Sequence, residues 1–244
     1  MPLIRSLLLL VWMLVTVIPW GLALLLGSVV VRGPALWWFA VSWMRVVVWG
    51  ARVIVGIRVR VTGLEHITQA PFAAAVLLAK HQSTFETLLL PTLVPHPMAF
   101  VFKRELLRIP FFGWSMARLD MIHIDRAAHA QALLNVLAQG QRLLARRVWV
   151  ILFPEGTRVA RGERGNYRTA GARLAIKSGV PVFPIALSCA KCWPRKGFVK
   201  YPGVVDVSIG PAIPSAGRES KELMREVETW IETEMRRIDP QAYH

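Results

Sequence analysis

An uncharged apolar run at the N-terminus constrains this chain more than any other feature. From Ser6 to Val31 no residue is charged, and about 20 apolar residues are enough for a helix to cross the hydrocarbon layer. Pro19, Trp20 and Gly21 interrupt the run near its middle. The interruption is compatible with a kinked span, a re-entrant hairpin or an anchor in one leaflet, and the sequence leaves these three open.

A second apolar stretch runs from Pro34 to Gly50 and contains four tryptophans with a single charge, at Arg45. This mixture predicts a helix at the membrane–water interface. A cleaved secretory signal fits the N-terminus less well, because the apolar core is too long and no clear cleavage site follows. We therefore expect membrane-anchoring helices in residues 1–57 and an α/β domain in residues 58–244.

The chain is strongly basic, with a formal net charge of +15 and a pI near 11.1. Beside an apolar anchor, such a charge suits anionic lipid head groups, whereas in a soluble protein it would suit nucleic acid. Ten Lys or Arg and one acid lie between Arg158 and Lys200, without zinc-finger spacing or an RNP-like aromatic box. We expect membrane lipid, and not nucleic acid, as the partner.

Cys189 and Cys192 are the two cysteines and form a single C-x-x-C. This motif could be a redox pair or half of a zinc site, but no second pair or paired histidines complete a metal cage. We expect two reduced thiols and no metal.

Short β-rich runs alternate with helical stretches after residue 57, which predicts a mixed, largely buried sheet flanked by helices. Apolar periodicity predicts two helices on the outside of this sheet, at Ala128 to Arg147 and Arg218 to Ile238. The expected strands are Ile57 to Val61, Phe72 to Ala79, Met98 to Phe102, Met121 to Ile124, Val148 to Phe153, Val180 to Ala186 and Val204 to Ile209.

His81 comes directly after one of these strands, and Glu86 follows five residues later. A histidine can take a proton from an alcohol near neutral pH when a second group fixes its tautomer. Glu86 can do this only if His81 lies in the turn before the helix, since residues five apart do not share a helix face. The alternative for Glu86 is a capping box, in which it reaches back to the N–H of Ser83.

Two further segments carry cations beside apolar residues. Phe153 to Arg158 contains Gly156, which lets backbone N–H groups approach an anion, and a forked donor for phosphate. An ordinary strand-to-loop turn with a solvated arginine is the alternative. Lys103 to Trp114 could hold a charged head group beside an apolar chain, or could be a basic helix end on core aromatics.

These segments resemble those of the glycerolipid acyltransferases of the lysophosphatidic acid acyltransferase type, over roughly residues 58 to 210. Four blocks occur in the order expected of that family: His81 to Glu86, Lys103 to Trp114, Phe153 to Arg158, and Val180 to Ile185. The chain departs from the family pattern in two places, with Glu86 at the usual aspartate and Lys80 where asparagine often precedes the histidine.

The resemblance implies transfer of a fatty acyl group to the sn-2 hydroxyl of 1-acyl-glycerol-3-phosphate, giving phosphatidic acid. The donor is an acyl thioester, acyl-CoA or acyl carrier protein, used as co-substrate without a bound cofactor. His81, held by Glu86, is implied as the base, and the Gly156 N–H is the expected oxyanion donor. Glu155 is expected on the acceptor side or as a partner of Arg158. The implied phosphate-binding residues are Lys103, Arg104, Glu155, Gly156, Thr157 and Arg158.

The expected location is the inner membrane, with the catalytic domain on the cytoplasmic side. Three alternatives stay open at this point. The acceptor could be another lyso-lipid, such as a lyso-aminolipid or a lysophospholipid. Gly113 to Ala117 approaches the G-x-S-x-G elbow of serine hydrolases but ends in alanine. The chain could also be a non-catalytic membrane protein that binds anionic lipid.

Overall fold

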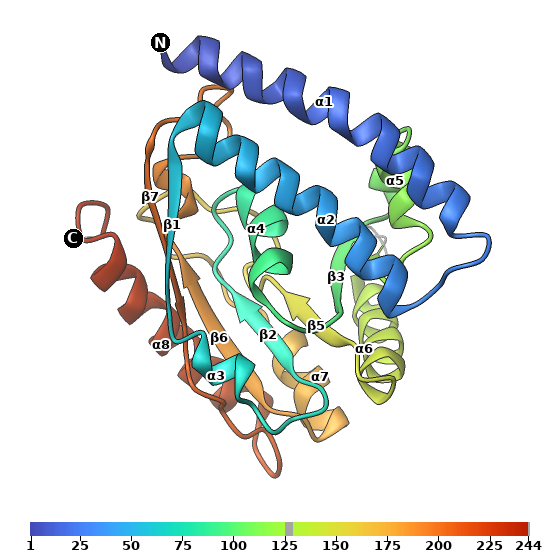
Figure 1. The fold of residues 1–244 in the computed structure, drawn as a ribbon. Helices are drawn as coiled ribbons and strands as arrows, with labels where there is room; N and C mark the ends of the chain where they lie inside the picture. The colour runs from blue at the N-terminus through green and yellow to red at the C-terminus, as the bar shows by residue number, and fades with distance from the viewer. Residues whose placement is uncertain (125–128, 244) are drawn as a thin grey trace.

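A seven-stranded sheet forms the centre of the molecule (Figure 1), in a computed structural model that describes residues 1–124 and 129–243. The strand order is β1-β7-β6-β2-β5-β3-β4. Strands β6 and β7 pair antiparallel and all other neighbours pair parallel. The mixed sheet and the α/β class are confirmed. The strands are β1 (Ile57–Thr62), β2 (Val76–Ala79), β3 (Met98–Lys103), β4 (Ile122–Ile124), β5 (Trp149–Leu152), β6 (Val182–Leu187) and β7 (Gly203–Ile209).

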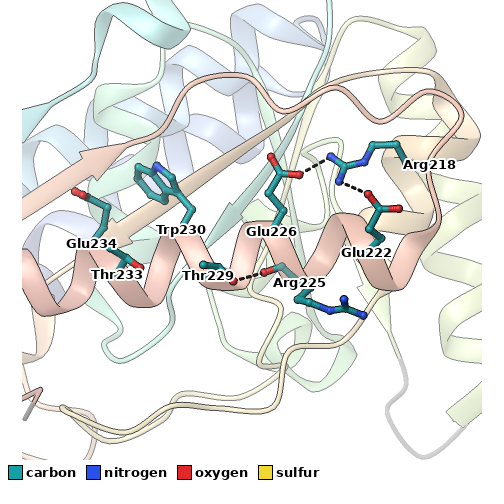
Figure 2. Close-up of a pocket in the computed structure, with 8 residues that line it drawn as sticks. All are labelled: Arg218, Glu222, Arg225, Glu226, Thr229, Trp230, Thr233 and Glu234. Carbon is teal, nitrogen blue, oxygen red and sulfur yellow. Dashed lines mark hydrogen bonds and ion pairs between the residues drawn. The ribbon is translucent and has the colours of Figure 1, made fainter.

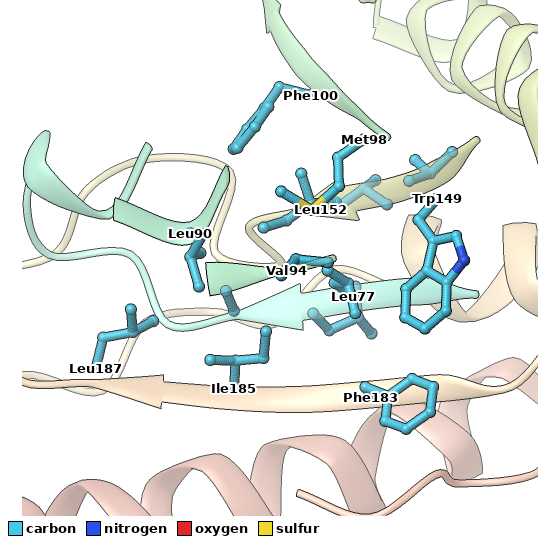
Figure 3. Close-up of a cluster of buried hydrophobic side chains, with 14 of the residues drawn as sticks. Leu77, Leu90, Val94, Met98, Phe100, Trp149, Leu152, Phe183, Ile185 and Leu187 are labelled. Atoms are coloured by element: carbon cyan, nitrogen blue, oxygen red, sulfur yellow. The ribbon is translucent and has the colours of Figure 1, made fainter. Parts of the chain in front are cut away.

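The central strands are buried along their whole length, as expected for parallel strands covered on both faces. Every residue of β2, β5 and β6 is buried. Figure 3 shows Leu77, Trp149, Phe183 and Ile185 from these strands within one apolar cluster, where the rings of Trp149 and Phe183 stack with centroids 5.6 Å apart. The predicted strand at Phe72 begins later, at Val76.

Helices cover both faces of the sheet (Figure 1). Helices α6, α7 and α8 pack side by side against β5, β2 and β6, while α4 lies on the other face with α2. Right-handed crossovers explain this division, because the chain leaves β2 toward β3 in one direction and leaves β5 toward β6 in the other. The elements are α3 (Glu65–Thr68), α4 (Phe85–Leu93), η2 (Arg104–Arg108), α5 (Phe112–Met116), α6 (His129–Ala145), α7 (Ala170–Ser178), η4 (Cys189–Lys191) and α8 (Ser220–Ile238).

The two predicted amphipathic helices are α6 and α8, and the predicted start at Ala128 lies outside the described residues. Helix α8 buries Leu223, Val227 and Ile231 on one side. This spacing is the apolar stripe that the sequence predicted.

The N-terminal apolar segments form a helical hairpin of α1 (Pro2–Gly27) and α2 (Pro34–Gly50), and η1 (Ala51–Val55) leads from it into the sheet (Figure 1). Helix α1 and the segment Pro34–Val55, which joins α2 and η1, are both long and apolar enough to cross a membrane. Helix α1 continues through Pro19 without a break. The indole N–H of Trp43 donates to Thr16 Oγ1 at 3.1 Å, which ties the two helices together.

Two of the four tryptophans of α2 face the protein core. Trp37 and Trp43 are buried, and only Trp49 is largely exposed. Val41 and Val47 of the same helix are fully buried in the core that also contains the sheet. The expected boundary at residue 57 therefore separates two segments of sequence but not two hydrophobic cores.

Gly21 explains the predicted interruption in the apolar run. A Cβ at this position would lie 3.0 Å from the Cβ of Phe111, closer than side-chain packing normally allows. Phe111 itself has a left-handed backbone (φ 58) just before α5. The glycine thus serves close packing of α1 on the segment before α5, and it does not end the helix.

We expect Gly21→Leu to lower the free energy of unfolding by about 1–3 kcal/mol through overpacking against Phe111. Gly27→Leu is the matched control, because it lies in the same helix and nothing is within 4 Å of its would-be Cβ. It controls for the gain in helix propensity over glycine. Thermal unfolding of both variants in detergent measures the difference, and equal stability would contradict the close contact.

Candidate active site

The predicted motifs meet at one edge of the sheet. Strands β2, β5 and β3 are parallel neighbours, so their carboxyl ends lie side by side, where α/β folds place their ligand sites. His81 follows β2, Phe153 to Arg158 follows β5, and Lys103 ends β3. The fourth block, Val180 to Ile185, enters β6 beside β2 and contributes to the core instead.

His81 and Glu86 are in direct contact. His81 Nδ1 lies 2.7 Å from Glu86 Oε2, and His81 lies in the turn before α4, which begins at Phe85. When Nδ1–H donates to the carboxylate, Nε2 is the basic nitrogen of the neutral ring. The imidazole also stacks on Phe153, with ring centroids 3.8 Å apart. The expected pairing is therefore confirmed, and its orientation is fixed from two sides.

Glu86 also holds the turn that leads into α4. Its carboxylate is fully buried and accepts the backbone N–H of Gln82 at 2.9 and 3.1 Å. Burial raises the pKa of Glu86, while the N–H groups of Gln82 and Ser83 and the charges of Arg158 and Lys80 oppose that rise. The same side chain thus contacts the His81 ring and holds the backbone of the preceding turn, while Thr84, the N-cap residue of α4, has no side-chain cap hydrogen bond.

Glu155 is not a partner of Arg158, which corrects one expectation. It is 3% exposed. Its Oε2 accepts the backbone N–H of His81 at 2.7 Å, and its Oε1 forms an ion pair with Lys80 at 2.9 Å. Because the carboxylate points to these groups, it supports the His81 turn and does not line the acceptor side.

Arg158 lies on the same side of the sheet edge as His81. Its guanidinium donates to Thr84 Oγ1, in the turn between His81 and Glu86, and its own carbonyl accepts a hydrogen bond from Arg195. The side chain is only half-buried, so a charged donor remains accessible beside the histidine. His81 and Arg158 are brought together as expected.

Three further predicted phosphate ligands, Lys103, Arg104 and Thr157, are exposed. Lys103 and Arg104 lie at the end of β3 and the start of η2, and neither pairs with an acid among the residues that the structure describes. Thr157 is exposed at the tip of the turn after β5. These exposed side chains lie near the edge of the sheet, and contacts with the sheet do not hold them in place.

Gly156 is wrongly placed for the expected oxyanion role. Its N–H already donates to the Phe153 carbonyl at 2.9 Å within the turn. Its backbone is left-handed (φ 68), and a Cβ there would lie 3.3 Å from the guanidinium of Arg168. Glycine thus forms the turn and admits Arg168, a cation that no motif spacing in the sequence singled out.

The serine hydrolase alternative finds no support. Ser115 lies in α5 and lines an apolar cavity of about 50 Å³ between α1, α2 and α5. Its neighbours there include Trp20, Trp43 and Met116, and none of the described lining residues is a base.

Two other features lie outside the site. Cys189 and Cys192 are free and buried, and burial raises the pKa of both thiols.

An open cleft of about 580 Å³ runs along α8 (Figure 2), where Arg218 pairs with Glu222 and Glu226. Its lining contains none of the candidate site residues. Within residues 1–124 and 129–243, no three His, Cys, Asp or Glu side chains gather as a metal site.

Titration of the Glu155 carboxyl makes the free energy of unfolding depend on pH. Burial raises its pKa to about 7 from an ordinary value of 4.5, so between these pH values the folded chain holds a proton that the unfolded chain has lost. The contribution of this proton to the free energy of unfolding is full below pH 4.5 and is lost as pH rises through 7. The loss amounts to about 3 kcal/mol. We expect Glu155→Gln to flatten the fall in Tm over this range.

The control for this pH dependence is Glu219→Gln, an exposed substitution at the start of α8. It should leave the pH profile of Tm unchanged. The variant at Glu155 should keep a residual slope, because burial of Glu86 acts with the same sign. An unchanged profile in Glu155→Gln would show that this carboxyl is ionised well below neutral pH in the folded protein.

Comparisons with known proteins find a matching family model and similar sequences. The model of the family described as Acyltransferase matches residues 58–188. The chain is 43% identical to a 1-acyl-sn-glycerol-3-phosphate acyltransferase of Pseudomonas aeruginosa, over 82% of this chain and 77% of that protein. It is 30% identical to a mouse 1-acyl-sn-glycerol-3-phosphate acyltransferase alpha, over 71% of this chain and 61% of that protein.

The fold also matches a crystal structure. The 1-acyl-sn-glycerophosphate (LPA) acyltransferase PlsC from Thermotoga maritima superimposes with a TM-score of 0.78 at 26% identity. The match covers 97% of each chain, so it includes the N-terminal hairpin as well as the sheet.

Proposed function

The chain belongs to the Acyltransferase family, and from this membership we propose that it acylates the sn-2 hydroxyl of 1-acyl-glycerol-3-phosphate to give phosphatidic acid. The acyl donor is a thioester, acyl-CoA or acyl carrier protein. The observation that carries the proposal is the 2.7 Å contact of His81 with Glu86, beside an accessible Arg158 at the same sheet edge.

The chemistry follows from the fixed tautomer of His81. As the acceptor oxygen attacks the thioester carbonyl carbon, Nε2 takes the hydroxyl proton, and the Glu86 carboxylate stabilises the imidazolium. The tetrahedral intermediate then collapses with cleavage of the carbon–sulfur bond. The leaving thiolate receives the proton from His81, so the free thiol and the new ester form without a covalent acyl-enzyme.

Arg158 is the main phosphate ligand in this proposal, with Lys103 and Arg104 approaching from the end of β3. A guanidinium offers two parallel donors to a phosphate, which fixes orientation as well as charge. Holding the phosphate on one side of His81 places the acceptor's hydroxyl for attack, and such positioning supplies much of the rate in bimolecular transfers.

The hairpin is proposed to seat the site beside a membrane. The outer face of α1 exposes Leu7, Leu14 and Val15, while α2 packs on α4. Ile109 and Trp114, next to the proposed phosphate ligands, are exposed as well. Lipid substrates would then reach the site without leaving the bilayer. The proposed location is the inner membrane, with the catalytic domain on its cytoplasmic side.

We expect His81→Ala to lower kcat for acyl transfer by roughly 10²- to 10⁴-fold, with unchanged binding to anionic vesicles. The measurement is thiol release and product formation by the purified full chain, with acyl-CoA or acyl carrier protein as donor and a panel of lyso-lipids as acceptors. A preference for a lyso-aminolipid or another lysophospholipid would show that this lipid, and not lysophosphatidate, is the acceptor. Absence of turnover with every pair, alongside vesicle binding, would favour the non-catalytic lipid-binding protein.

Arg158→Ala should raise KM for a short-chain soluble lysophosphatidate by about 10- to 100-fold, because a charge-assisted bond to phosphate is lost. The KM for the acyl donor should stay near that of the wild type. Arg173→Ala is the matched control, since this arginine is exposed on α7 away from the sheet edge. A fall in kcat with unchanged acceptor KM would show that Arg158 does not hold the ground-state phosphate.

A further inference from the structure

Lys80 is a buried ammonium directly before the proposed base, in a position that the reaction scheme does not use. We propose that Lys80 is a positioning residue, which joins Glu155 to Glu232 of α8 and thereby holds the His81 turn against the end of β5. This inference rests on the proposed function for its catalytic consequence. The contacts themselves stand independently of which lipid is acylated.

The ammonium of Lys80 is fully buried and lies close to three oxygen atoms. Its Nζ lies 2.6 Å from Glu232 Oε1, 2.9 Å from Glu155 Oε1 and 3.1 Å from the Glu163 carbonyl oxygen. The Glu232 and Glu163 oxygens accept hydrogen bonds from this ammonium, and the contact with Glu155 Oε1 is an ion pair. Burial of an unpaired charge would be very costly, and pairing with carboxylates offsets that cost.

Glu155 connects this ion pair to the base. Its second oxygen, Oε2, accepts the His81 backbone N–H at 2.7 Å, and the Val159 N–H donates to the His81 carbonyl at 2.8 Å. Both backbone polar groups of His81 are therefore held by the segment after β5. Because Lys80 fixes the other oxygen of Glu155, it determines where that carboxylate can lie.

Helix α8 supplies the far end of the network. Glu232 is 4% exposed, and the Tyr167 hydroxyl donates to its Oε1 at 2.7 Å. The Tyr167 ring also lies 5.8 Å from the Lys80 ammonium. Glu232, 152 residues downstream of Lys80, thus takes part in placing the proposed base, although it belongs to none of the predicted motifs.

The positive charge of Lys80 also affects the protonation of Glu155. Glu155 faces the ammonium of Lys80, the backbone N–H of His81 and the charge of Glu86, and Tyr167 and Tyr243 also interact with it. Burial raises the pKa of Glu155, and the charge of Lys80 is the strongest influence in the opposite direction. Removing Lys80 would raise the pKa of Glu155 further, so its neutral form would predominate over a wider pH range and its hold on the His81 N–H would weaken.

The test compares Lys80→Met, Glu155→Gln and the double variant in the purified full chain. Acting through Glu155, Lys80→Met should lower kcat about tenfold or more and move the acid limb of kcat to higher pH, with acceptor KM changed less than about threefold. In the Glu155→Gln background it should lower kcat by less than about twofold. An equal loss in both backgrounds, or an unmoved acid limb, would overturn the proposal.

A second pair of measurements covers misfolding and failure of the proposed function. Lys80→Met with Glu232→Leu removes the buried pair together, which usually preserves the fold, and it should keep the kcat loss. Recovery of wild-type kcat would refute the role.

Hydrogen exchange of the peptide containing residues 79–86 should accelerate in Lys80→Met but not in the exposed control Lys221→Met. Exchange decides the role of Lys80 even if the wild type acylates no lysophosphatidate, and unchanged exchange would overturn it.

Discussion

Parallel pairing of β2, β5 and β3 is the constraint on which the site depends. Strands that run in the same direction end at the same edge, so residues far apart in sequence become neighbours there. His81 and Arg158 each follow the end of a buried strand, and the short turns leave them little freedom. If β2 or β5 ran in the opposite direction, His81 and Arg158 would lie at opposite ends of the sheet.

The charges at this edge are buried to an unusual degree for a surface reaction. Glu86, Glu155 and Lys80 are each at most 3% exposed. Burial raises the pKa of both carboxylic acids, and the compensating contacts come from backbone N–H groups and one ammonium. The outcome is a set of groups that cannot relax by moving into water, which keeps the imidazole orientation fixed while the acceptor binds and leaves.

The apolar hairpin is part of this architecture and not an appendage to it. Helix α2 shares its core with the sheet, and α1 contacts Phe111 through Gly21. Phe111 lies between the exposed cations at the end of β3 and helix α5. The segment proposed to hold a phosphate is therefore braced on the helices proposed to lie at the membrane, which links lipid access to the geometry of the site.

The sequence alone determined the strands, the long helices and the His81–Glu86 pair. Local periodicity, turn residues and a five-residue spacing contain that information. Sequence patterns misplaced Glu155 and Gly156, and they gave no role to Glu232. Those assignments depend on which oxygen faces which donor and which helix face meets the core. Long-range packing sets both, so only the tertiary structure decided them.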